Sequence, residues 1–211
     1  MGGGTGTGAA PIVADLAHEA GILTVGVVTK PFKFEGANRM RRAEQGIAEL
    51  SGKVDSLIII PNDRLKYVTD QKITFANAFG IADDVLKQAV TSISELVGDA
   101  GNVVINLDFA DVSAIMKDAG RAHMGVGIAS GREKAEQAAL AAINSPLLET
   151  SINGATGVLV NVTGSAELTL DDVETAAGIV QEAANPEANI IFGATWDENY
   201  EDEIRVTVIA T

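Results

Sequence analysis

The chain has 211 residues, of which 46% are hydrophobic and 4% aromatic, and its formal net charge is −14. This is enough apolar material for one large domain or two small ones with mainly aliphatic cores. Because the chain has no cysteine and two histidines, disulfides and thiolate metal sites are excluded and a histidine-rich metal site is not expected. No apolar run approaches the length of a membrane span and no signal peptide is visible, so we expect a soluble cytoplasmic protein without direct membrane insertion.

The negative charge is concentrated in the second half of the chain. Residues 1–97 carry a net charge of −1, and residues 98–211 carry −13. This asymmetry predicts two units with different surfaces. No basic face stands out, so nucleic acid is not expected as a partner.

The chain opens with a glycine-rich run, Met1-Gly2-Gly3-Gly4-Thr5-Gly6-Thr7-Gly8. We expect a loop here that leads into a helix over residues 9–20, so that its backbone N–H groups and the helix dipole can hold a phosphate chain. The order of the glycines excludes a P-loop. Gly4-x-Gly6-x-x-Ala9 satisfies a loose dinucleotide-binding pattern, which leaves a nicotinamide-dependent oxidoreductase as an alternative, although Lys30 stands where an acidic ribose-binding residue is wanted.

Helical and buried-strand patterns alternate along the first half of the chain. Such alternation predicts an α/β fold with a Rossmann-like parallel sheet. The expected elements are helices over 9–20, 37–50 and 75–97, and strands over 22–28 and 54–60.

The second half predicts an α/β sandwich that follows the long helix over 75–97. We expect its last two strands to pair as a hairpin. The expected elements are helices over 109–117, 132–143 and 170–184, and strands over 123–129, 157–163, 188–195 and 203–211.

Five residues of the first half stand where a nucleotide binds in an open α/β sheet. Glu35 and Arg39 suit ribose hydroxyls and phosphate, but their spacing also fits a surface ion pair. Asn62 follows a strand and offers an amide to a base edge, or caps a turn. Phe79 and Asp83, one helical turn apart, could stack on and hydrogen-bond to guanine, or could be a core residue and a solvated carboxylate.

A second group, Asn106-Leu107-Asp108-Phe109-Ala110-Asp111, follows the long helix. Asp108 and Asp111 suit a pair that polarises water, although helix capping is the simpler explanation. The 14 residues from Asp83 to Val97 make roughly 20 Å of helix. These aspartates are therefore expected to reach a nucleotide bound to a neighbouring copy, in a head-to-tail contact that generates a filament.

Together these motifs resemble the FtsZ family, the bacterial relatives of tubulin, over essentially the whole chain. The glycine run matches the family's signature loop. Further matches in family order are Lys30-Pro31-Phe32-Lys33-Phe34-Glu35-Gly36, Ile60-Pro61-Asn62-Asp63, Ala78-Phe79-Gly80, Asp83-Asp84-Val85-Leu86, the segment from Asn106 to Asp111, Ser145-Pro146-Leu147-Leu148 and Arg205-Val206-Thr207-Val208.

The resemblance implies a GTPase that polymerises into protofilaments of the division ring at mid-cell, with GTP or GDP and Mg²⁺ as cofactors. It divides the chain into part of a GTP-binding domain (1–74), a central helix (75–97) and an activation domain (98–211). It implies that the phosphates are bound by Gly3, Gly4, Thr5, Gly6 and Thr7, and the ribose and phosphate region by Glu35 and Arg39. Guanine would be bound by Asn62, Phe79 and Asp83. The active site of a neighbouring subunit would be completed by Asn106, Asp108 and Asp111.

The chain departs from the family because the segments that precede the signature loop, the C-terminal linker and the short tail that binds other division proteins are missing from the sequence. We therefore expect exposed sheet edges and apolar surface, and weak GTP binding by this chain alone. A non-catalytic fragment that caps filaments through its Asp108 end remains a further alternative.

Overall fold

We describe a computed structural model of residues 1–67, 73–97, 103–105, 109–148 and 152–211. The chain forms two compact units. Unit 1 contains residues 1–90 and 116–122, and unit 2 contains residues 91–115 and 123–211. Among the residues that the structure describes, no helix is long and apolar enough to cross a membrane.

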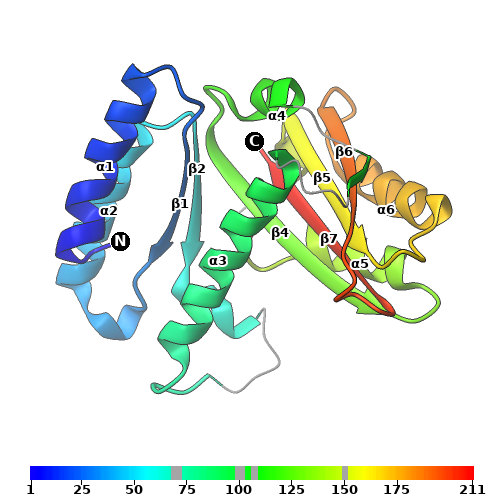
Figure 1. Ribbon diagram of the computed structural model, residues 1–211. Helices are drawn as coiled ribbons and strands as arrows, with labels where there is room; N and C mark the ends of the chain where they lie inside the picture. The colour runs from blue at the N-terminus through cyan, green and yellow to red at the C-terminus, as the bar shows by residue number, and fades with distance from the viewer. Residues whose placement is uncertain (68–72, 98–102, 106–108, 149–151) are drawn as a thin grey trace. The chain divides into compact units, whose positions relative to one another are not determined.

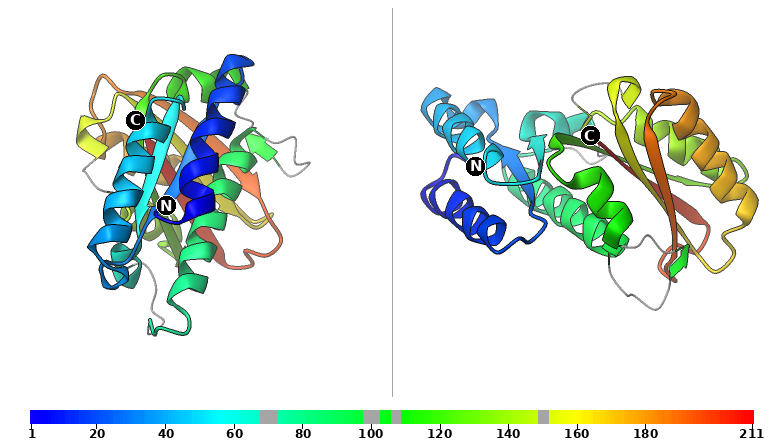
Figure 2. Two further views of the ribbon diagram at one scale, coloured as in Figure 1. Left: turned by 90° about the vertical axis from the view of Figure 1, so that its left-hand side faces the viewer. Right: turned by 90° about the horizontal axis from the view of Figure 1, so that it is seen from above.

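Unit 1 is built on parallel strands. β1 (Val25–Lys30) pairs with β2 (Ser56–Pro61), and β2 pairs with the first three residues of β4 (Gly120–Ser130). Two helices, α1 (Gly4–Glu19) and α2 (Ala37–Ser51), lie side by side (Figures 1 and 2) and pack on this sheet through one apolar core. The buried residues of that core are Ala14, Val28, Ile47, Leu50, Leu57 and Ile59.

β2 is buried on both faces, as its run of isoleucines predicts. Leu57 and Ile59 face the core shared with α1 and α2, while Ile58 and Ile60, which alternate with them, are also almost fully buried. The outer side of α1 carries exposed apolar side chains instead. These are Ile12, Val13 and Leu16.

The glycine-rich opening differs from the prediction, because α1 begins at Gly4 and not at Ala9. Five residues expected in a loop, Gly4 to Gly8, are helical, and only Met1, Gly2 and Gly3 precede the helix. The Gly2 N–H donates to Thr7 Oγ1 at 2.7 Å, and the Thr7 side chain packs on Gly46 of α2. These tertiary contacts offset the poor helix propensity of glycine.

Unit 2 holds the rest of β4 together with β3 (Val103–Ile105), β5 (Gly157–Gly164), β6 (Asn189–Trp196) and β7 (Glu203–Ala210). From residue 123 onward β4 pairs with β7, and the order continues through β5 and β6 to β3. β5 and β6 are parallel, and the other pairs are antiparallel.

The predicted hairpin of the last two strands is wrong. β5 lies between β6 and β7 and pairs with both. All eight residues of β5 are buried, and a strand buried on both faces takes an interior position in a sheet. The acidic turn after Trp196 therefore connects two strands that are not neighbours.

Two helices cover one face of the sheet in unit 2, as Figure 1 shows. α5 (Lys134–Ile143) packs through alanines, and α6 (Leu170–Ala183) begins with a capping box in which Thr169 and Asp172 exchange hydrogen bonds. Even-numbered residues of β5 and β7 face these helices. The opposite face carries odd-numbered polar residues, and Glu95 of α3 (Ala78–Val97) contacts Arg205 on it.

The remaining elements are short. α4 (Phe109–Met116) ends close to β5, because the Ile115 side chain lies against Gly157. Short 3-10 turns cover Lys33–Glu35, Asn62–Tyr67 and Ile152–Gly154.

Candidate nucleotide site

The N-terminus of α1 is open to solvent. Gly3 stands at the N-cap position and no side chain caps it, while Gly3, Gly4, Thr5 and Gly6 are all exposed. The first turn contains no acidic residue. The first N–H groups of a helix have no partner within the helix, and the dipole places positive charge there, so this terminus suits an anion such as a phosphate.

Gly2 places this terminus next to Arg39. Its φ of +97° lies in the region that favours glycine. A Cβ at Gly2 would lie 2.8 Å from the Arg39 carbonyl oxygen and 3.1 Å from Pro31 Cγ. The nitrogen of Met1 donates to the Thr29 carbonyl at 2.8 Å, which fixes the entry to the helix on the end of β1.

Glu35 is engaged through both carboxylate oxygens. Oε1 accepts the Phe32 N–H at 2.8 Å, and Oε2 pairs with Arg39 Nε at 3.0 Å. The Glu35 side chain is 6% exposed and that of Arg39 is 51% exposed. The ion pair that the spacing allowed is therefore present. The pair uses Nε of Arg39, and the Arg39 side chain as a whole is still half-exposed.

Four phenylalanines from two segments form a cluster. Phe32 stacks on Phe34 with ring centroids 5.0 Å apart, and Phe79 meets Phe32 edge-on at 5.8 Å. Phe75 meets Phe34 at 5.0 Å. Phe79 is still 49% exposed, so it is not a simple core residue. A partly exposed ring held by its neighbours is a suitable platform for a base.

A cavity of about 320 Å³ adjoins this cluster. Asn62 contributes to its wall, is 5% exposed, and its Oδ1 has no hydrogen-bond partner. Leaving such an atom unpaired costs about 1–3 kcal/mol, so it suits a ligand that brings a donor. The lining residues are Phe32, Phe34, Asn62, Asp63, Lys66, Ile73, Thr74, Phe75 and Ala78.

Sequence reasoning missed part of this wall. The sequence motifs contain Phe34 and Asp63 without assigning either of them to the site, and Phe75 is in no motif. Asp63 Oδ1 accepts the Lys33 N–H at 3.3 Å and so ties the two segments together. Three of the six phenylalanines of the chain lie within residues 32–75, and this local concentration is the signal that could have found them.

The remaining predicted residues fall in two places. Asp83 is exposed on α3, one turn beyond Phe79. Asp111 is half-buried in the first turn of α4. Asn106 and Asp108 lie outside the described residues. Within the described ranges, no three His, Asp or Glu side chains gather as a metal site.

Two family models match the chain. Residues 1–70 match the Tubulin/FtsZ family, GTPase domain, and residues 120–211 match the FtsZ family, C-terminal domain. The chain belongs to the FtsZ family. It is 57% identical to "Cell division protein FtsZ 1" of Rhizobium meliloti and 56% identical to "Cell division protein FtsZ" of Bartonella bacilliformis. Both alignments include the whole chain, which spans 36% of each relative's length.

Solved structures agree with the assignment to the FtsZ family. An empty FtsZ dimer of M. jannaschii superposes with a TM-score of 0.95 at 43% identity, over 100% of this chain and 61% of that one. GDP-bound CetZ1 of Haloferax volcanii superposes with a TM-score of 0.79 at 17% identity, over 99% of this chain and 61% of that one. At this identity the likeness shows the fold alone. The tubulin/FtsZ fold expected from the sequence is confirmed, and neither the oxidoreductase nor the capping alternative is favoured.

Proposed function

We propose that the chain is part of a GTPase that binds guanine nucleotide and polymerises head to tail. The single observation that carries this proposal is the open N-terminus of α1, held beside Arg39 in the unit that also contains the Asn62 cavity and the Phe79 ring. The match of residues 1–70 to a GTPase-domain model, and relatives named as cell division proteins, support it.

The phosphates would lie at the start of α1. The N–H groups at Gly3, Gly4, Thr5, Gly6 and Thr7 are the proposed donors, and they need no lysine because the helix terminus supplies the positive charge. Arg39 would add a charged donor, with Glu35 fixing its orientation through the 3.0 Å ion pair. Mg²⁺ would bind mainly to the phosphate oxygens and water.

The base would contact Asn62, Phe79 and Asp83. Guanine presents a ring N–H and an amine on one edge, and the unpartnered Asn62 Oδ1 and the exposed Asp83 carboxylate are both acceptors. Adenine presents a ring acceptor there, which would leave a buried acceptor unpaired. Phe79 would stack on the purine.

Hydrolysis would be completed by the next subunit of the filament. Asp108 and Asp111, with Asn106 nearby, are proposed to polarise the attacking water. In this proposal residues 1–74 belong to the nucleotide-binding domain, residues 75–97 form the central helix, and residues 98–211 activate the neighbour. The site of action is the division ring at mid-cell, reached through partners of the whole protein.

A mixing experiment tests hydrolysis in trans. The protein is a chimaera in which this chain replaces the matching segment of Rhizobium meliloti FtsZ 1. Asp111→Ala is expected to bind GTP without turnover, and Asn62→Ala to bind GTP poorly. Mixed, the second variant supplies Asp111 to the first, so turnover should exceed the sum of the separate rates. A mixture whose GTP turnover does not exceed that sum would overturn hydrolysis in trans. The control is an Asp111→Ala sample to which the same amount of Asp111→Ala protein is added in place of Asn62→Ala.

A further inference from the structure

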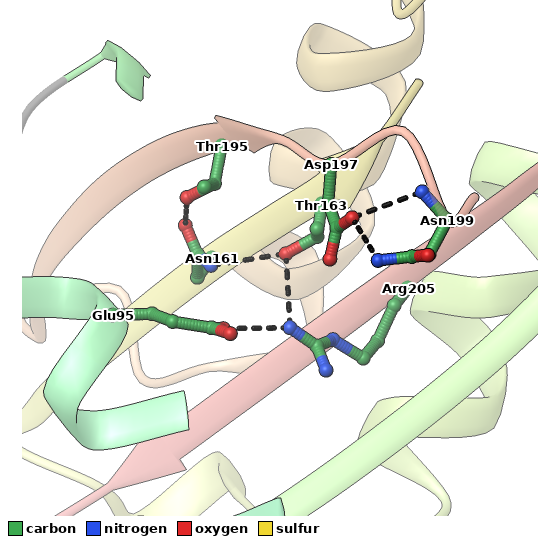
Figure 3. Close-up of polar contacts among 7 residues, drawn as sticks. All are labelled: Glu95, Asn161, Thr163, Thr195, Asp197, Asn199 and Arg205. Carbon is green, nitrogen blue, oxygen red and sulfur yellow. Dashed lines mark hydrogen bonds and ion pairs between the residues drawn. The ribbon is translucent and has the colours of Figure 1, made fainter. Parts of the chain in front are cut away.

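A row of polar side chains, most of them buried, crosses the sheet of unit 2 (Figure 3). Arg205 Nη2 donates to Glu95 Oε2 at 2.7 Å and to Thr163 Oγ1 at 3.4 Å. Asn161 Nδ2 donates to Thr163 Oγ1, and Thr195 Oγ1 donates to Asn161 Oδ1, both at 3.2 Å. We call Glu95, Arg205, Thr163, Asn161 and Thr195 the polar row.

The polar row is not explained by stability alone. Arg205, Thr163, Asn161 and Thr195 are each less than 9% exposed, while the Glu95 side chain is 26% exposed. Burial of the Arg205 charge costs several kcal/mol before its attraction to Glu95 is counted. Apolar side chains of similar volume are often as stable at such positions. A row of this kind is better understood as fixing the geometry of the elements that it joins.

The elements that it joins lie on either side of one connection. Glu95 stands in the last turn of α3, just before the chain leaves the helix at Val97. Thr195 is the register partner of Val103, where the chain re-enters the sheet as β3. Both ends of the connection from α3 to β3 are therefore held by the same polar row.

β3 stands at the edge of the sheet, next to β6, and its register with β6 shifts between Val103 and Ile105. An edge strand with an irregular register depends on the strand beside it for its position. The position of β3 thus follows that of β6 at Thr195 and Ala194.

β3 precedes α4 in the chain, and α4 carries Asp111 in its first turn. The far end of α4 is fixed separately, because the Thr211 hydroxyl donates to the Ile115 carbonyl at 3.4 Å. Ile105, the last residue of β3, and Phe109, the first residue of α4, are four positions apart in the sequence, so chain connectivity limits how far the start of α4 can lie from β3.

We propose that the polar row positions the segment that carries Asp111, and so sets the rate of hydrolysis without contributing to nucleotide binding. Its members are positioning residues and touch no reacting atom. The catalytic part of this inference rests on the proposed function, whereas the structural part concerns this chain alone.

Thr163→Val and Thr207→Val form a matched pair that tests the proposal. Thr163 Oγ1 is the acceptor at the centre of the polar row, while the equally buried Thr207 Oγ1, on the same face of the sheet, has no hydrogen-bond partner. Both substitutions exchange a hydroxyl for a methyl group. Only the first breaks the row.

The first measurement is hydrogen exchange of the backbone amides of residues 103–105 and 109–112 in the 211-residue chain. Thr163→Val is expected to accelerate it about tenfold, as for other residues that couple two sites, and Thr207→Val to leave it unchanged. Equal exchange in the two variants overturns the proposal, whatever the activity of the protein.

The second measurement is GTP turnover and binding by the chimaera with Rhizobium meliloti FtsZ 1. Thr163→Val should lower kcat about tenfold with less than a twofold change in nucleotide affinity, and Thr207→Val should change neither. Accelerated exchange with unchanged kcat would overturn the catalytic part. If the unmodified chimaera hydrolyses no GTP, the proposed function fails, and the exchange result still decides whether the row positions β3.

The double variant Glu95→Met/Arg205→Met separates positioning from stability. Removing both charges is expected to keep the melting temperature near that of the unmodified chain. Exchange at residues 103–105 should nevertheless remain fast, because Thr163 has lost its arginine donor. A double variant with unaltered exchange would show that packing alone holds β3, which contradicts the proposal.

Discussion

Thr7 joins three parts of unit 1 through one side chain. Its hydroxyl accepts the Gly2 N–H at 2.7 Å, and its methyl group packs on Gly46 of α2. A Cβ at Gly46 would overlap Thr7 Cγ2 and would lie 3.2 Å from Met1 Cε. The absence of a side chain at Gly46 thus allows α1 to approach α2 at the end that forms the proposed phosphate site.

Gly46→Ala is expected to destabilise unit 1 by about 1–3 kcal/mol, because β-branched Thr7 cannot move its methyl group away cheaply. Thr7→Ser removes that methyl and keeps the hydroxyl, so the double variant should recover most of the loss. Gly178→Ala, in the middle of α6 where a Cβ meets nothing within 4 Å, is the control and should stabilise by about 0.4–1 kcal/mol. Chemical denaturation measures the stability of Gly46→Ala, of the double variant and of Gly178→Ala. If Gly46→Ala were as stable as the unmodified chain, the contact between Thr7 and Gly46 would be refuted.

Burial raises the pKa of the Tyr200 phenol. Arg205, whose guanidinium lies 5.2 Å from the ring centroid, opposes the shift, and Asp197, Glu95 and Glu203 reinforce it. Because the folded pKa lies above the unfolded value of 10.0, the folded state holds this proton more tightly. The contribution to stability is complete below pH 10 and is lost as the pH rises through the folded value.

Tyr200→Phe, which cannot ionise, is therefore expected to lose less stability than the unmodified chain as the pH rises above 10.0. Tyr67→Phe is the control, since Tyr67 is exposed on its 3-10 turn. Melting curves at several pH values give the comparison. Parallel pH profiles for the unmodified chain and Tyr200→Phe would contradict the assigned direction.

Several site residues could be predicted from the sequence because strand ends are marked locally. Asn62 follows an isoleucine run and Pro61, so its place at the end of β2 was predictable from the sequence. The cavity beside it was not, because its walls come from residues 32–34 and 73–78, which only tertiary packing brings together. The dual engagement of Glu35 likewise depends on the backbone turn at Phe32.

At the scale of elements, two glycines set the distance between β4 and α5. A Cβ at Gly125 or Gly127 would overlap the carbonyl oxygens of Ala142 and Ala138 respectively. These alanines are themselves fully buried. The strand and the helix therefore touch backbone to backbone, and neither contact can be relieved by a change of rotamer.

Gly127→Ala is expected to destabilise unit 2 by about 3 kcal/mol or more, at the upper end of the cost of overpacking, because backbone must move. Gly131→Ala tests a different cost, since its φ is +89° and no atom lies within 4 Å of its Cβ. It should lose only about 1–2 kcal/mol. Denaturation followed by circular dichroism distinguishes them, and the reverse ranking would refute the close approach.

A helix or strand was predictable where a single buried face sets the spacing of its apolar residues. The helix expected over 37–50 is α2, Ala37–Ser51, because its apolar residues repeat with helical spacing. Strand order was less predictable. The sequence predicts a hairpin of the last two strands, but the completely buried β5 lies between β6 and β7, and such pairing is non-local.

At the scale of the whole molecule, models of a GTPase domain and of a C-terminal domain match residues 1–70 and 120–211, and the chain spans 36% of the length of its curated relatives. Unit 1 holds the residues proposed to bind the nucleotide, and unit 2 holds Asp111 and the polar row. Binding and hydrolysis are thereby assigned to different sets of residues, which makes them separable by mutation.

The most direct test of the account is the affinity of labelled GTP and ATP analogues for the chimaera with Rhizobium meliloti FtsZ 1. We expect GTP to bind and ATP to bind at least about 100-fold more weakly, because a site that pairs with donor groups on a base rejects an analogue lacking them. Asn62→Ala and Asp83→Ala should each weaken GTP binding about tenfold or more. Equal affinity for the two nucleotides, or GTP affinity unaffected by both substitutions, would contradict the account.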